Sequence, residues 1–348
     1  MIVAQRIVSI YSDVIDNLRG NASHLGKAVA IPSFSEQNID QLCNFSISQL
    51  KVVPSLLLIN NDIVVVGDIH GNLHNLVSIF IKHGFPPTQR YLFIGNYVDY
   101  GMFSLETSTL LLALASTYPD HVFLLKGETE SYALQVFQGF YEEVVTMYHS
   151  CSIWNYFMKV FEYLPVAAYI NRSILCAHLG VLNQYESLDH ISLQMRPIRI
   201  PQFADAFKEV SKTQDSDNDR IYQGIADKYK VSFIVSGGCQ IGDSLNSYAG
   251  GRIYTISACE QDLDITVLPI FIGKSNEFDT SESTDCLKRD ECKFQIITLQ
   301  PISKKFLSIP ITIPKTISHT LLDKKISPTV RRKVFENKSI LGIFIDQT

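Results

Sequence analysis

Residues 63–72 read IVVVGDIHGN, four β-branched apolar residues followed at once by a polar, glycine-containing turn. Four consecutive apolar residues of this kind indicate a strand that is buried on both faces. In the turn, Asp68 stands two residues before His70, and side chains at this spacing point the same way in an extended segment. A carboxylate and an imidazole can grip one divalent cation. The segment therefore predicts a buried strand ending in a candidate metal site, although a hydrogen-bonded turn explains the same pair.

The same pattern recurs along the chain. Predicted strands cover 63–66, 91–94, 122–125, 173–177, 233–235 and 252–256, and the first five are followed by GDIHGN (67–72), GNYVDYG (95–101), KGETE (126–130), HLG (178–180) and SGGCQ (236–240). Apolar residues at helical spacing predict helices over 73–83, 104–118, 132–148 and 153–164. Alternating strands and helices indicate an α/β fold, in which ligand sites form beyond the carboxyl ends of the strands. The loops are therefore expected to converge on one site.

The ends of the chain differ from its centre. Residues 2–19 predict an amphipathic helix that Gly20 stops, 273–291 predict an exposed acidic loop, and 293–299 predict a strand. After Pro301 the chain has nine Lys and Arg against three acids, so it carries +6, and the remainder carries −11 of the total −5. We expect an N-terminal helical extension (1–29), a central domain (30–301) and an extended, at best partly ordered, basic tail (302–348). A solvated tail and a partner-docking tail both stay open.

Composition excludes several classes of protein. With 348 residues, 46% of them apolar, the chain is neither disordered nor a small disulfide scaffold. A net charge of −5 gives no attraction to nucleic acid, and no apolar run is long enough to cross a membrane. The first apolar stretch contains Arg6 and Asp13 and lacks a cleavage site, so no signal peptide is expected. Seven cysteines without a CxxC pair favour a reducing compartment, cytoplasmic or nuclear.

The loops resemble the signatures of the PPP-type serine/threonine protein phosphatases, which have the metallophosphoesterase (calcineurin-like) fold. That family carries GDxHG, GDxxDRG, GNHE and a later HGG, and this chain adds HGFPP (83–87), SLET (104–107), GFYEE (139–143) and FQIITLQP (294–301) in the family's order. The resemblance implies a sandwich of two mixed β-sheets flanked by helices. It also implies hydrolysis of phosphoproteins by two metal ions, with a bridging hydroxide as nucleophile and a histidine as general acid.

Five positions match the family's functional residues. By this resemblance Asp68 and His70 are ligands of the first metal, and His178 is a ligand of the second. Asp99 matches the aspartate that partners the acid histidine, and Arg220 matches a phosphate-holding arginine. Each of three residues also has a purely structural alternative. His178 could be a buried neutral imidazole, Asp99 could cap the loop, and Arg220 could lie on the surface.

Five other positions depart from the family. Asn96 replaces the metal-bridging aspartate, and a neutral amide is a poor bridge between two repelling dications. Tyr100 replaces an arginine and cannot form a bidentate pair with phosphate. GNHE reads GETE, so Glu128 replaces an asparagine ligand and Thr129 replaces the acid histidine, a loss of about 10²–10⁴-fold in rate. Cys239 stands at or near the last histidine ligand.

The charge of the metal site nevertheless persists. The six ligand positions are Asp68, His70, Asn96, Glu128, His178 and Cys239, which sum to −2, or −3 with a thiolate, against −2 in the family. The site could therefore still bind one divalent ion (zinc, manganese or iron), and a thiolate at Cys239 would favour zinc. A two-metal centre is not expected. Glu128 as a paired carboxyl and Cys239 as a small buried residue are the alternatives.

These observations predict a pseudophosphatase that keeps the fold and binds proteins, either phosphoproteins or phosphatase regulatory subunits. The first alternative is a slow metal-dependent phosphoesterase with a metal site rebuilt around Glu128 and Cys239. The second is a structural module whose site has collapsed. No nucleic-acid or membrane partner is expected.

Overall fold

The structure is a computed structural model. It describes residues 1–20, 29–131, 139–198, 215–238, 243–259, 265–272, 286–289, 292–300 and 306–311. The chain divides into the units Met1–Ile311 and Thr312–Thr348, and the second unit lies outside the described residues, so the description concerns the first. In the part that is described, no helix has the length and apolar character needed to cross a bilayer.

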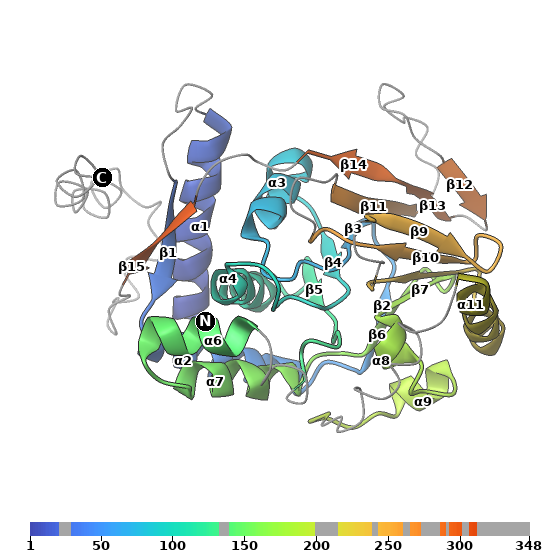
Figure 1. The fold of residues 1–348 in the computed structure, drawn as a ribbon, viewed down its shortest axis with the longest axis horizontal. Coiled ribbons are helices and arrows are strands. Elements are labelled where there is room, and N and C mark those ends of the chain that lie inside the picture. The colour runs from blue at the N-terminus through green and yellow to red at the C-terminus, as the bar shows by residue number, and fades with distance from the viewer. Residues whose placement is uncertain are drawn as a thin grey trace. The chain divides into compact units, whose positions relative to one another are not determined.

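Two mixed β-sheets form the centre of this unit (Figure 1). The first contains β12 (Cys286–Arg289), β13 (Cys292–Gln295), β11 (Ile265–Ile272), β3 (Ile63–Val66), β4 (Tyr91–Phe93) and β5 (Val122–Leu124) in that order, with β14 (Ile297–Leu299) also paired to β11. The second contains β2 (Leu56–Ile59), β6 (Ala167–Ile170), β7 (Ile174–Ala177), β8 (Phe233–Ser236), β10 (Ile253–Ile256) and β9 (Leu245–Tyr248). The predicted α/β sandwich of two mixed sheets is confirmed.

The central strand β3 explains why residues 63–66 are all apolar. Ile63 and Val65 join a core made by the inner faces of both sheets, together with residues such as Leu92 of β4 and Val235 of β8. The alternate residues of β3 are also buried. Burying one such side chain contributes about 1.5–3 kcal/mol. A strand covered on both faces can therefore hold the loop that follows it in one position.

Helices cover the sheets. They are α1 (Ile2–Gly20), α2 (Glu36–Leu50), α3 (Leu73–His83), α4 (Ser104–Thr117), α6 (Gly139–Tyr148), α7 (Ser152–Phe161), α8 (Leu179–Leu182), α9 (Leu188–Ser192) and α11 (Asp215–Tyr229). Four of the predicted helices appear as α1, α3, α4 and α7. The fifth appears as α6 in its second half, and residues 132–138 lie outside the described part.

One prediction for the second half of the chain is wrong. Residues 273–291 were predicted to form an exposed loop, which is wrong for the described part, because β12 pairs antiparallel with β13. The polar composition of the segment gives no strand pattern, whereas the structure makes β12 the edge strand of the first sheet. The strand predicted over 293–299 is confirmed as β13 and β14, which are separated at Ile296.

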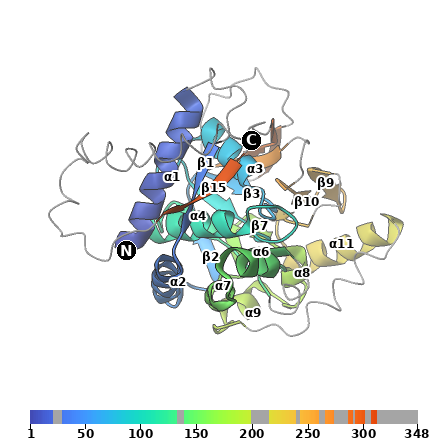
Figure 2. The ribbon, with the colours of Figure 1, turned by 60° about the vertical axis from the view of Figure 1, so that its left-hand side comes forward.

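Both ends of the first unit lie together. Strand β1 (Val29–Phe34) pairs in parallel with β15 (Phe306–Ile311), and α1 packs against α4 and β1 (Figure 2). The ring of Phe306 stacks on His74 in the first turn of α3, with centroids 3.8 Å apart. Residues 306–311, within the predicted basic tail, therefore pack with the unit Met1–Ile311.

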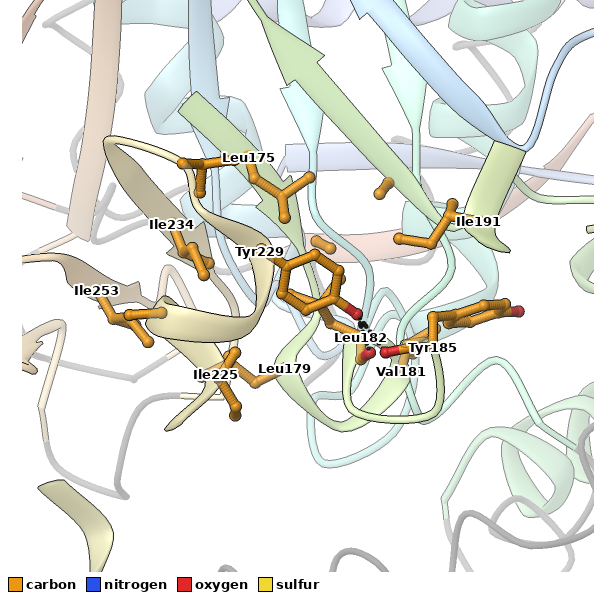
Figure 3. Packing of buried hydrophobic residues seen from close by; sticks show 14 of the residues in the cluster. Leu175, Leu179, Val181, Leu182, Tyr185, Ile191, Ile225, Tyr229, Ile234 and Ile253 are labelled. Carbon is orange, nitrogen blue, oxygen red and sulfur yellow. Dashed lines mark hydrogen bonds between the residues drawn. The ribbon is translucent and has the colours of Figure 1, made fainter. Parts of the chain in front are cut away.

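A second apolar cluster supports the loop after β7. Helix α11 packs its apolar face on α8 and β8, and Ile225 and Ile234 belong to this cluster (Figure 3). The buried hydroxyl of Tyr229 donates towards the carbonyls of Leu182, at 2.7 Å, and Tyr185, at 2.6 Å. Because α8 begins directly after His178, this anchor restrains the chain that carries that histidine.

Candidate functional site

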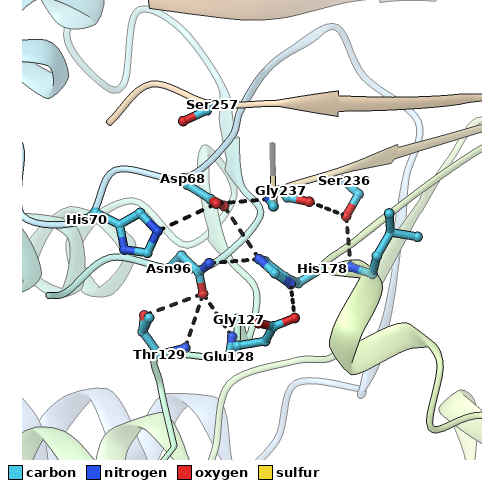
Figure 4. Close-up of polar contacts among 12 residues, drawn as sticks. Asp68, His70, Asn96, Gly127, Glu128, Thr129, His178, Ser236, Gly237 and Ser257 are labelled. Atoms are coloured by element: carbon cyan, nitrogen blue, oxygen red, sulfur yellow. Dashed lines mark hydrogen bonds and ion pairs between the residues drawn. The ribbon is translucent and has the colours of Figure 1, made fainter. Parts of the chain in front are cut away.

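The predicted loops meet where the two sheets adjoin. Strands β3, β4 and β5 run parallel, so the loops 67–72, 95–101 and 126–130 leave the same edge of the first sheet. The ends of β7 and β8 add His178 and the residues after Ser236 from the second sheet (Figure 4). The N–H of His70 donates to the carbonyl of Asn96 at 2.8 Å, which joins the first two loops. The structure thus brings together Asp68, His70, Asn96, Glu128 and His178.

Asp68 is the buried centre of this group. Its Oδ2 accepts from the N–H of Gly238 at 2.9 Å and lies 3.6 Å from Nε2 of His70, and its Oδ1 lies 3.6 Å from Nε2 of His178. Burial opposes ionisation, but the two imidazoles hold the pKa of Asp68 well below its usual range. A Cβ at Gly237 would lie 2.1 Å from Oδ1, so only glycine fits beside this carboxylate.

His70 is oriented by the backbone. Its Nδ1 lies 3.0 Å from the carbonyl of Val98, which makes Nδ1 the protonated nitrogen and turns Nε2 towards Asp68. The ring edge also contacts Tyr100, with centroids 4.8 Å apart and planes at 89°. His70 adopts φ 46°, a left-handed conformation uncommon for a residue with a Cβ. The loop thus directs one imidazole nitrogen at one carboxylate.

The amide of Asn96 is oriented by the loop after β5. Its Oδ1 accepts from the backbone N–H of Glu128 at 2.9 Å and of Thr129 at 3.1 Å. These two donors identify the oxygen, so the NH₂ group points the other way. That group lies 2.8 Å from Nε2 of His178. The side chain thus offers N–H bonds, not an oxygen, to the centre of the site.

His178 is buried and contacted on both nitrogens. At 2.8 Å the Asn96 amide can donate only to an unprotonated Nε2, which places the ring proton on Nδ1, 3.0 Å from Glu128. Burial and the Asn96 donor favour this neutral ring, whereas Glu128 and Asp68 raise the pKa of the imidazole. A cationic ring would carry a hydrogen on Nε2 and could not accept from Asn96, so the contact of 2.8 Å belongs to the neutral form, in which the amide occupies the Nε2 lone pair.

Glu130, to which the sequence analysis assigned no role, holds the loops in register. One oxygen accepts from the N–H groups of Asn96, at 2.8 Å, and Gly127, at 2.9 Å. The other accepts from the N–H of Tyr97 at 2.8 Å and from the hydroxyl of Thr129 at 3.0 Å. The sequence places Glu130 as the last residue of GETE, which suggests a position at the site. It does not show the role, because a carboxylate that accepts from distant backbone N–H groups produces no pattern among neighbouring residues.

The position of the general acid is not titratable. Thr129 is buried and donates its hydroxyl to Glu130. Asp99, expected to partner an acid histidine, accepts from the N–H of Phe140 at 3.0 Å through Oδ1, while Oδ2 has no hydrogen-bond partner among the described residues. Burial raises the pKa of Asp99 to about 6.

The remaining predicted residues lie elsewhere. Arg220 is exposed on α11, and no contact among the described residues links it to Asp68 or His178. Cys239 falls outside the described residues; the preceding Gly238 lies against the ring of His178. Tyr100 is 74% exposed at the rim of the site.

Comparison with known proteins identifies the family of this chain. Residues 62–238, just over half of the chain, match the family described as calcineurin-like phosphoesterase. The chain belongs to that family. Members of the calcineurin-like phosphoesterase family use divalent metals in general.

Serine/threonine phosphatases are among the relatives. The chain is 40% identical over 166 residues to the serine/threonine-protein phosphatase PP2A-like PPG1 of Candida albicans, covering 47% of this chain and 40% of that protein. It is 37% identical over 170 residues to the serine/threonine-protein phosphatase PP1-1 of Saccharomyces cerevisiae, covering 49% and 55%. The matches thus span about half the length of these relatives, and the resemblance to this phosphatase class is confirmed.

A solved structure shows the same fold. A protein serine/threonine phosphatase from Saccharomyces cerevisiae with similarity to human phosphatase PP5 superposes with a TM-score of 0.61 at 21% identity, covering 77% of this chain and 91% of that chain. At this identity the likeness concerns the fold alone.

The described residues do not fit the two-metal centre that the family resemblance implies. Within the described ranges, no group of three or more His, Cys, Asp or Glu side chains is arranged to hold a metal ion. Asp68 and His70 keep suitable donors, but Asn96 turns N–H bonds inward, and Glu128 lies against Nδ1 of His178. Among these residues, the buried atoms without a hydrogen-bond partner in the described part are Oδ1 of Asp68, Oε1 of Glu128 and Nδ1 of His178, and the last two face each other at 3.0 Å.

Proposed function

We propose that this calcineurin-like phosphoesterase is a pseudophosphatase, which binds other proteins and does not hydrolyse phosphate esters at a useful rate. The observation that carries the proposal is the contact of 2.8 Å between the Asn96 amide and Nε2 of His178. The resemblance places a carboxylate at this position, where it would hold two cations. An amide that donates into the site cannot do so.

Loss of the acid supports the same conclusion. A positioned general acid contributes about 10²–10⁴-fold to rate, and a threonine hydroxyl does not exchange a proton near neutrality. Because the Thr129 hydroxyl already donates to Glu130, it is not directed at a leaving group. No described residue takes over the expected contact with Oδ2 of Asp99.

The charge of the site favours protein contacts over phosphate binding. The buried carboxyl groups are Asp68, Asp99, Glu128 and Glu130, and Lys126 is the buried primary amine among them. Without a divalent ion, the carboxylates of this group repel a phosphate dianion. At the rim, Tyr100 and Met102 are 74% and 76% exposed and present apolar surface beside His70. A regulatory subunit shared with active relatives therefore suits this chain better than a phosphate group bound at the site.

The alternative of a slow phosphoesterase requires Glu128 to face a cation. Its Oε1 instead lies 3.0 Å from Nδ1 of His178, on the side of the ring away from Asp68. A carboxylate in that place orients a histidine but does not ligate a metal shared with Nε2. This contact favours the pseudophosphatase.

Turnover of an aryl phosphate and a phosphopeptide tests the catalytic part of the proposal. We expect the full chain, supplied with manganese, iron or zinc, to react no faster than its Asp68→Ala variant and about 10³-fold more slowly than an active relative. Turnover within about tenfold of the relative, abolished by Asp68→Ala, would refute it.

Competition tests the binding part. The full chain is titrated into an active relative bound to its regulatory subunit, and displacement of the relative is followed by size-exclusion chromatography. A scaffold that shares the subunit displaces the relative. If no subunit of any active relative is bound, the scaffold role is wrong.

A further inference from the structure

We propose that a hydrogen-bond network formed by Asn96, Glu128 and His178 replaces the metal centre, so that the chain folds and keeps this site formed without a divalent ion. The proposal concerns what holds the site together. It is separate from the question of which proteins the chain binds.

The first step is an exchange of residue types. By resemblance, the family has an acid at position 96 and an amide at position 128, and this chain has Asn96 and Glu128. The exchange keeps one carboxylate and one amide. It reverses their chemistry, because the amide can donate hydrogen bonds where the acid could only accept them.

The second step is what the amide connects. Oδ1 of Asn96 accepts from the loop after β5 at 2.9 and 3.1 Å, and Nδ2 donates at 2.8 Å to the histidine after β7. Strands β5 and β7 belong to different sheets. One neutral side chain therefore ties together loops that the family joins through ions.

The third step is that Glu128 completes the contact on the far side of the ring. Its Oε1 lies 3.0 Å from Nδ1 of His178 as an ion-pair contact, so a carboxylate stands at one ring nitrogen and the Asn96 amide at the other. The other carboxylate beside the ring, Asp68, accepts from Gly238 through Oδ2. A metal entering the site would have to break the Asn96 contact before it could reach Nε2. That cost disfavours binding wherever the network is intact.

The test measures metal content and thermal unfolding of the full chain. Purified protein is incubated with manganese, zinc or iron and desalted, and elemental analysis is expected to find well under one ion per chain. The unfolding midpoint is expected to be the same in EDTA as in added metal, because an ion that binds the folded state at 100 times its dissociation constant would raise it by about 2–4 °C or more. One ion per chain, or a rise that Asp68→Ala removes, would overturn the proposal.

Restoring the family's residue types gives a second readout. Asn96→Asp and Glu128→Asn are made singly and together, with the exposed Asn61→Asp as the matched control. In EDTA we expect each site variant to unfold several degrees below the wild type and the control to unfold with it. Added manganese should raise the midpoint of the double variant only. An Asn96→Asp variant as stable in EDTA as the control would show that the network does not hold the site.

The two proposals fail in different ways. Bound metal without turnover would end the proposed network and leave the pseudophosphatase intact. Brisk turnover would end the pseudophosphatase, and the elemental analysis would then show whether the network had failed with it.

Discussion

At the scale of single residues, the orientation of one amide separates this site from a metal centre. The Asn96 side chain could direct either its oxygen or its nitrogen at the site. Its oxygen accepts hydrogen bonds from two backbone N–H groups of the loop after β5. Its nitrogen is therefore left to face His178. The left-handed φ of 54° at Asn96 belongs to the same tight turn, a conformation that asparagine tolerates better than most residues.

Asp99 gives a prediction for pH. Burial raises its pKa to about 6, with Glu130 adding to the effect and the Phe140 N–H and His70 opposing it. In the unfolded chain an aspartate has a pKa of about 3.9, so between about pH 4 and 6 the folded state holds more protons. The contribution of Asp99 to stability is therefore lost as pH rises through this window, by up to about 3 kcal/mol.

We expect Asp99→Asn to stabilise the protein at pH 7, by up to about 3 kcal/mol, and to leave stability unchanged near pH 4. Urea unfolding at a series of pH values measures this, with the exposed Asp120→Asn as control. A variant that is less stable than the wild type at pH 7 would show that the Asp99 carboxylate has a stabilising partner.

At the scale of elements, loops are held by contacts that come from distant strands. Gly67 can follow β3 only because it has no side chain, since a Cβ there would lie 2.0 Å from the carbonyl of Ile256. The carbonyl of Asp68 then accepts from the N–H of Ala258 at 2.8 Å. The close approach of β3 and β10 thus places the loop that carries Asp68 and His70.

Helix α11 has a comparable role for the loop that carries His178. The buried Tyr229 hydroxyl contacts the carbonyls of Leu182 and Tyr185. We expect Tyr229→Phe to lower the free energy of unfolding by about 1–3 kcal/mol, because the two buried carbonyls lose a donor. The same change at Tyr169, whose hydroxyl contacts Arg172 at an exposed position, is expected to cost under about 0.5 kcal/mol. Equal costs in denaturant titrations would contradict this account.

At the scale of the whole molecule, the folded unit extends beyond the predicted central domain. Strand β15 pairs with β1 along its length, and Phe306, only 5% exposed, contacts His74 and Phe103. The ring of Phe306 thus packs beside the helix that follows the site loop. Residues 306–311 therefore belong to the fold by contact, although the sequence places them in the basic tail.

We expect Phe306→Ala to destabilise the protein by about 3–5 kcal/mol, as for other buried phenylalanines. Leu307→Ala in the same strand is the control, because Leu307 is 47% exposed, and its expected cost is below about 1 kcal/mol. Unfolding midpoints in urea distinguish the two. Similar small losses for both variants would mean that β15 adds little to the unit.

Much of the molecule could be predicted from local patterns. The run at 63–66, the repeated strand-and-loop pattern and the helices α3, α4 and α7 follow from the spacing of apolar residues, which is a property of neighbours in the chain. The strand β12 and the helix α11 could not be predicted in this way. Their segments are rich in polar residues and have only a weak apolar pattern, and pairing in the tertiary structure overrides local propensity.

The amino-acid sequence alone determined the family, the sandwich of sheets and the loops where the site would form. It also identified which residues differ from the family's motifs, because a substitution at a motif position is visible without coordinates. Tertiary structure decided what these residues do: that Asn96 donates to His178, and that Glu128 lies at Nδ1. The physical reason is that the direction of an amide or a carboxylate is set by donors and acceptors 32 to 82 positions away in the chain, which no local pattern records.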